Sequence, residues 1–130
     1  MSNRASYNIT TRNDIVIIKI MGSFDRLLSQ RCFKELKKTL EGLPANRPFV
    51  LLVNALRYTG ATPEAFEQAT LFNQWLKGTS CIAKAYVVVQ KIQLQIVKNH
   101  APEMPDILHN DFDNQEQALT WLEELLLHYK

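Results

Sequence analysis

The feature that most constrains the fold is an unbroken apolar run, residues 49–53, which ends at the polar Asn54. Such a run is typical of a strand buried on both faces, because neither face keeps a polar side chain for water. Strands of this kind belong to α/β sheets, and ligands and partners bind those sheets beyond the carboxyl ends of the strands. We therefore expect the functional end of the molecule at a loop over residues 54–62.

Helix and strand patterns alternate along the rest of the chain. Strand-like residues on either side of Asn13 and Asp14 predict a hairpin over residues 7–20. The apolar stripe after it predicts a helix that begins at Asp25 and ends at Gly42. Further helices are expected over residues 63–77, 91–99 and 113–127, and further strands over residues 83–89 and 107–112. The order β-β-α-β-α-β-α-β-α predicts an α/β fold, in which helices pack on a mixed sheet.

Composition and charge narrow the classes of function. With 130 residues, of which 46% are hydrophobic and 22% are charged, we expect a single globular domain over residues 1–130. The 15 basic residues are scattered and the net charge is +2, which argues against a nucleic-acid partner. Apolar runs are far shorter than the ~20 residues of a membrane span, and no secretory leader pattern begins the sequence. We expect a cytoplasmic protein in which Cys32 and Cys81 stay reduced.

Three segments resemble one family. Gly-Ser-Phe-Asp at residues 22–25 resembles the G-x-x-D motif that starts the first helix of STAS domains, the anti-sigma-factor antagonist fold. Residues 112–122 are similar to the ending F-x-(D/N)-x-E-x-A-x-x-W-L of bacterial SpoIIAA-like proteins, and residues 82–89 look like their penultimate strand. The resemblance implies a STAS-like mixed sheet and a non-catalytic role in regulation or protein interaction.

Thr59 is the candidate site of phosphorylation. In regulatory STAS domains, the loop after the third strand carries an Asp-Ser pair whose serine is phosphorylated by a partner kinase. This chain has no such pair, and the acceptor nearest that place is Thr59. A phosphate there would precede a helix N-terminus, which favours anions, and Arg57 could pair with it. The alternative is that Thr59 and Thr62 satisfy turn and cap amides.

The loop and the helix after it are expected to form a protein-contact surface. The residues assigned to its polar rim are Asn54, Arg57, Tyr58, Thr59 and Thr62. Leu71 and Trp75 are an i, i+4 pair about 100° away from the core stripe of the expected helix, so they are the predicted apolar anchors. An exposed pair would mark a protein partner or self-association as a homodimer, whereas a wide apolar arc would make the pair part of the core.

A small hydrophobic, lipid-like ligand is the alternative function. The aromatic side chains that could gather at a pocket mouth beside Asn54 are Phe24, Tyr58, Phe66 and Phe72. Aromatic groups with a few polar groups are the usual lining of a ligand pocket. The competing interpretation is that these rings fill the core.

Catalysis is the function that the sequence favours least. The histidines show no metal-ligand spacing; they are His100, His109 and His128. No serine or cysteine has a base at a known motif distance, although Cys81 precedes an expected strand and could be exposed. The expected loop over residues 54–62 also lacks a glycine-rich phosphate cradle, a nucleophile elbow and a pair of acidic residues. We therefore predict no catalytic residue, no metal and no cofactor.

Overall fold

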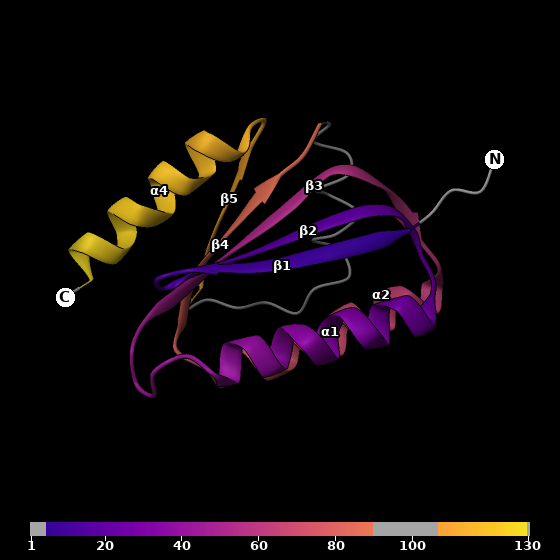
Figure 1. The fold of residues 1–130 in the computed structure, drawn as a ribbon, viewed down its shortest axis with the longest axis horizontal. Coiled ribbons are helices and arrows are strands. Elements are labelled where there is room, and N and C mark those ends of the chain that lie inside the picture. The colour runs from indigo at the N-terminus through magenta and orange to yellow at the C-terminus, as the bar shows by residue number, and fades with distance from the viewer. Residues whose placement is uncertain (1–4, 90–106, 130) are drawn as a thin grey trace.

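The structure is a computed structural model that describes residues 5–89 and 107–129. Its elements are β1 (Ser6–Arg12), β2 (Ile15–Phe24), α1 (Arg26–Glu41), β3 (Phe49–Ala61), α2 (Pro63–Leu76), β4 (Cys81–Val87), β5 (Leu108–Phe112) and α4 (Gln115–His128). The helix expected over residues 91–99 lies outside the described residues. The strands form one sheet in the order β1-β2-β3-β4-β5, with β1 antiparallel to β2 and the other neighbours parallel (Figure 1). The mixed sheet expected from the sequence is confirmed.

The hairpin between β1 and β2 turns at the predicted residues. Arg12 pairs with Ile15, and Asn13 has a φ of 56°, a left-handed conformation that asparagine tolerates better than most residues. Asp14 accepts a hydrogen bond from Arg47 Nε at 3.0 Å, and this bond ties the turn to the segment that leads into β3. The opening hairpin thus supplies the antiparallel edge of the sheet.

The helices lie on both faces of the sheet. Figure 1 shows α1 and α2 on one side and α4 on the other. Along β3, alternate side chains face opposite layers, because Leu51 packs in the cluster that includes α1 and α2 while Leu52 packs in the cluster that includes α4. Their exposed fractions are 1% and 0%. The apolar run at residues 49–53 is therefore a strand buried on both faces, as its sequence predicts.

The prediction of a loop over residues 54–62 is wrong, because β3 continues as far as Ala61. Strand β3 stays paired with β2 as far as the pair Phe24 and Ala61. At two places β3 has one residue more than β2: opposite the step that follows Lys19 of β2, and opposite the step that follows Gly22 of β2. Each extra residue is a β-bulge, which interrupts the alternation of side chains between the two faces. This interruption explains why the pattern after the apolar run does not resemble a strand.

Side chains cap the starts of the helices. Asp25 accepts a hydrogen bond from a first-turn amide of α1 at 2.8 Å, and Thr62 does the same for α2 at 3.2 Å, as predicted for both residues. Helix α4 begins later than the expected start at residue 113. Asn114 has the extended backbone of a cap, and its side chain accepts a first-turn amide at 2.9 Å.

Candidate functional site

A cavity of about 120 Å³ lies between the sheet and helices α1 and α2. Side chains from β2, β3, β4 and both helices form its walls, and most of them are apolar. Typical wall residues are Ile18, Leu36, Leu51, Val53 and Val88. The cavity therefore occupies the layer in which the apolar stripe of α1 meets the sheet.

Alanine side chains create this space. The alanines on the cavity wall are Ala55, Ala61, Ala65 and Ala69. Each of these side chains ends at Cβ, so the facing parts of β3 and α2 lack the longer side chains that fill the rest of the layer. Protein interiors are normally packed as densely as organic crystals. A space of this size is thus a departure from normal packing that particular residues of the chain produce.

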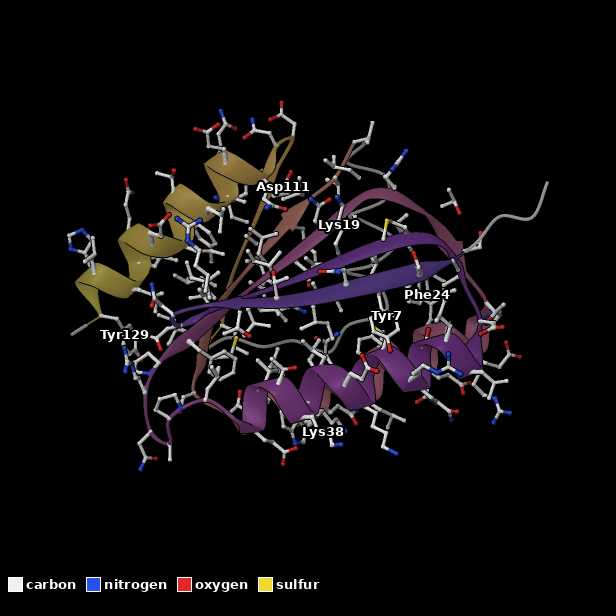
Figure 2. All side chains as sticks on the ribbon, in the orientation of Figure 1. Tyr7, Lys19, Phe24, Lys38, Asp111 and Tyr129 are labelled. Carbon is white, nitrogen blue, oxygen red and sulfur yellow. The ribbon has the colours of Figure 1, made fainter. Side chains whose placement is uncertain are left out.

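Aromatic rings line much of the remaining wall. The four rings that the sequence singled out share this one cavity; they are Phe24, Tyr58, Phe66 and Phe72. Phe24 and Tyr58 meet edge to face with ring centroids 6.3 Å apart, and Phe33 stacks on Phe72 at 4.9 Å. Figure 2 shows Phe24 on the α1 side of the sheet. Whether the rings hold a ligand stays a prediction.

Two buried polar residues, Lys84 and Asn73, interrupt the apolar wall. Lys84 Nζ donates a hydrogen bond to Asn73 Oδ1 at 2.9 Å, and the two residues are 4% and 5% exposed. Lys84 Nζ also lies 5.1 Å from the centroid of the Tyr86 ring, within the range of a cation–π contact. No carboxylate among residues 5–89 and 107–129 forms an ion pair with Lys84. The cavity therefore has one basic end in apolar surroundings.

Lys84 and Asn73 were not expected at a site, although both carry a signal in the sequence. Lys84 is a charged residue between apolar neighbours in an otherwise apolar strand, which places its side chain in the interior. Asn73 follows Ala65 and Ala69 at four-residue intervals, so it lies on the face of α2 that meets the sheet. A polar residue on each of two facing apolar surfaces is a sign of a shared polar contact.

Asn54, expected at the rim of a functional loop, is buried between β3 and α4. It is 4% exposed, and its Nδ2 donates to Gln115 Oε1 of α4 at 2.8 Å. Its Oδ1 accepts from the backbone amide of Leu56 at 3.2 Å, within the first bulge of β3. These bonds place the Asn54 side chain on the α4 face, because strand alternation directs it away from the face of Leu51. The prediction of a pocket mouth beside Asn54 is therefore wrong.

Arg57 and Thr59 are exposed residues of β3 and do not belong to a loop. The hydroxyl of Thr59 lies 2.8 Å from the hydroxyl of Ser23 on β2, within hydrogen-bond distance. This contact links the two strands next to the second bulge. Phosphorylation of Thr59 and its pairing with Arg57 stay predictions.

Leu71 and Trp75 do not form one exposed apolar pair. Leu71 is 56% exposed, whereas Trp75 is half-buried and packs against the core under α1 and α2. The Trp75 ring lies 5.8 Å from the Phe72 ring, and Lys37 Nζ of α1 lies 5.5 Å above it. Trp75 therefore covers the seam between the two helices, and Leu71 faces solvent. Their role in a partner contact stays a prediction.

Metal-ligating side chains do not gather in the described residues, and both thiols are buried. In residues 5–89 and 107–129, no group of three or more His, Cys, Asp or Glu side chains could hold a metal ion. Burial raises the pKa of Cys32 to about 12 and that of Cys81 to about 11, so both thiols resist ionisation. Cys81 is buried in β4, so its predicted exposure is wrong. His100 lies outside the described residues.

The helices within residues 5–89 and 107–129 are shorter or more polar than a membrane span requires. None of those in the described segments is long and apolar enough to cross a membrane.

Solved structures identify the fold, whereas no protein-family model and no curated protein matches the chain. An uncharacterised protein of the DUF3478 family with a SpoIIAA-like fold, from Shewanella loihica, superposes with a TM-score of 0.71 at 17% identity, over 94% of this chain and 98% of that one. An anti-sigma factor antagonist from Mycobacterium paratuberculosis superposes with a TM-score of 0.62 at 9% identity, over 95% of this chain and 97% of the other. The chain therefore has the SpoIIAA-like fold, as its sequence motifs indicate.

Proposed function

We propose that this chain is a non-catalytic binding module that holds a small apolar ligand in the cavity between its sheet and helices α1 and α2. The observation that supports this proposal is the cavity itself, which has a volume of about 120 Å³ and walls of apolar and aromatic side chains. An engineered apolar cavity of about 150 Å³ stays dry and binds benzene or xenon. A ligand with the size of one aromatic ring or a short alkyl chain suits such a space.

A titration with toluene tests this function. Nuclear magnetic resonance spectra of the labelled protein should show shifts at residues of the cavity wall, with Phe72 and Tyr58 among those most affected. The variant Ala65→Leu fills part of the cavity and should lose binding, whereas Gln74→Leu adds the same side chain to an exposed position of α2 and should keep it. Shifts that are spread over the surface, or that persist in Ala65→Leu, would contradict binding in the cavity.

Natural ligands can be tested separately. Organic extraction of the purified protein, followed by mass spectrometry, should recover a small apolar molecule at near-equimolar yield from the wild type. The Ala65→Leu variant should yield less of it. A protein that is recovered empty from several growth conditions would count against a resident ligand.

A protein partner is the second candidate function, supported by a different observation. The fold is shared with a protein that is named as an antagonist of an anti-sigma factor. In this chain α2 exposes Leu71, and the strand before it exposes Arg57 and Thr59. In this function Leu71 would be the apolar anchor, and Thr59 would be the residue that a kinase modifies.

Light scattering after size-exclusion chromatography tests self-association as the simplest form of this function. Leu71→Asp should dissociate a homodimer, whereas Leu127→Asp should not, because Leu127 is exposed on α4 at the other face of the sheet. A wild type that stays monomeric at all concentrations would argue against a homodimer. Incubation with cell extract and ATP, followed by mapping of phosphate, tests Thr59, and phosphate on another residue would remove this switch.

A further inference from the structure

The basic end of the cavity restricts the chemistry of its ligand. We propose that the ligand is a small apolar carboxylic acid, whose carboxylate pairs with Lys84 and Asn73 while its apolar part fills the cavity. This choice of ligand rests on the proposed function, since it requires that the cavity binds a small molecule.

Lys84 needs a counter-charge. Its side chain lies in an interior position, 4% exposed, and its hydrogen bond to Asn73 Oδ1 uses one of the three N–H donors of an ammonium group. The part of the chain that the structure describes provides no carboxylate for the other donors. The face of the Tyr86 ring replaces part of the lost hydration. Because a buried charge without a partner is costly, an anionic ligand gains affinity by supplying one.

Asn73 is oriented to take part in the same contact. Lys84 can only donate hydrogen bonds, so Asn73 must present its carbonyl oxygen to Lys84 and direct its NH₂ group elsewhere. Among the described residues, no hydrogen bond from this NH₂ group is present. An ammonium and an amide NH₂ side by side match the two oxygens of one carboxylate. The buried hydroxyl of Ser29 is a further polar group on the cavity wall.

The charge of the site distinguishes a carboxylate from other head groups. A phosphate carries about −1.5 to −2 charges, which the single ammonium group of Lys84 would not neutralise in apolar surroundings. A neutral apolar molecule would fill the cavity and leave the ammonium group of Lys84 without a counter-charge. A monoanion with two oxygens satisfies the charge and the geometry together. The cavity volume of about 120 Å³ then limits the rest of the molecule to one ring or a short chain.

Three probes of similar shape test the head group on the wild-type protein. Benzoate carries the carboxylate, benzamide is its neutral counterpart, and toluene has the ring without a polar group. Hydrogen bonds that involve an ionised partner are roughly twice as strong as neutral ones, so calorimetry should show benzoate binding at least about tenfold more tightly than benzamide. Benzoate should also shift the side-chain NH₂ signal of Asn73, which toluene should leave nearly unchanged.

Matched variants assign the preference to Lys84. Lys84→Met keeps the length of the side chain and should weaken benzoate binding by about tenfold or more while toluene binding is kept. Lys77→Met removes an exposed lysine at the carboxyl end of α2 and should leave both affinities unchanged. If Lys84→Met does not fold, the wild-type comparison of the three probes still decides the question, because it needs no variant.

The binding results distinguish the carboxylate preference from the proposed function as a binding module. Equal affinities for benzoate and benzamide, or benzoate shifts at exposed lysines alone, would overturn the carboxylate preference, while toluene binding in the cavity would leave the proposed function in place. Failure of all three probes to bind in the cavity would overturn both.

Discussion

Replacement of Ala65 by leucine should stabilise the folded protein, although a larger side chain in a packed core usually destabilises it. Ala65 is 3% exposed, and its side chain borders the cavity. Leucine adds three carbon atoms, and burial of each contributes about 0.8 kcal/mol, or about 2.4 kcal/mol in total. The loss of leucine rotamer freedom opposes this by about 0.5–1 kcal/mol. We therefore expect the free energy of unfolding to rise by about 1.5 kcal/mol.

The same substitution in α4 provides the control. Ala118 is 0% exposed and packs beside Leu122 in the layer between α4 and the sheet, away from the cavity wall. With no space to occupy there, the added carbon atoms should force side chains or backbone to move, at a cost of about 1–3 kcal/mol. The two Ala→Leu variants should therefore change stability in opposite directions.

Urea unfolding, followed by far-UV circular dichroism, measures both changes. At fixed slope, a higher midpoint for Ala65→Leu and a lower midpoint for Ala118→Leu are expected. Thermal unfolding should agree, since 1 kcal/mol corresponds to about 3–5 °C for a chain of this size. If Ala65→Leu is destabilised as much as Ala118→Leu, the space beside Ala65 does not accept a larger group, and the reasoning for a ligand cavity is refuted.

Four more predictions test the structural assignments. Asn54→Ala removes two hydrogen bonds of a buried side chain, so the free energy of unfolding measured in urea should fall by about 2 kcal/mol. A decrease of less than about 0.5 kcal/mol would contradict a stabilising contribution from these two bonds. Gly22→Ala should lower the free energy of unfolding by about 2 kcal/mol or more, because the residue has a φ of +79° and a new Cβ would lie 2.8 Å from Ala5 Cα. An unchanged melting temperature would count against this backbone geometry. Cys32 and Cys81 should resist a thiol reagent such as DTNB until the protein unfolds, because burial raises the pKa of these thiols to about 12 and about 11. Rapid labelling of the folded protein would contradict their burial. Thiols of the unfolded chain ionise near pH 9.0, so burial of the two protonated thiols contributes its full stabilisation below that pH. This contribution should be lost as the pH rises from 9 toward 11 and 12, because the unfolded thiols then ionise and the folded ones do not. Urea midpoints measured at rising pH would show the loss.

The order of elements could be predicted from the sequence because periodicity is a local property. Cys32, Leu36 and Leu40 recur at four-residue spacing and are all at most 5% exposed on the inner face of α1. Asp25 and Thr62 have side chains that cap a helix wherever it begins, and each caps the helix expected for it. Signals of this kind depend on neighbours in the sequence, so they survive without knowledge of the tertiary structure.

The course of β3 beyond the apolar run could not be predicted in the same way. Two bulges shift its alternation, so Arg57 and Thr59 resemble loop residues although both belong to the strand. The bulges are defined by the pairing of β3 with β2, a strand that is distant in the sequence. Alternation alone does place Asn54 on the face opposite Leu51, and this could have excluded it from the pocket.

The cavity itself depends on tertiary packing. The sequence identifies four of its aromatic residues, because large rings next to a few polar groups often line pockets. It does not show that the alanines of β3 and α2 face each other, nor that Lys84 of β4 meets Asn73 of α2. Each of these facts needs the distance between a helix and the sheet, which no local pattern contains.

A crystal structure of the protein crystallised in the presence of benzoate most directly tests the claim that the cavity binds a small apolar carboxylate. We predict electron density for the ring between β3 and α2, in contact with Phe72, and a carboxylate oxygen within about 3 Å of Lys84 Nζ. Benzoate bound elsewhere, or a layer in which side chains close the space between Ala65 and the sheet, would contradict the claim.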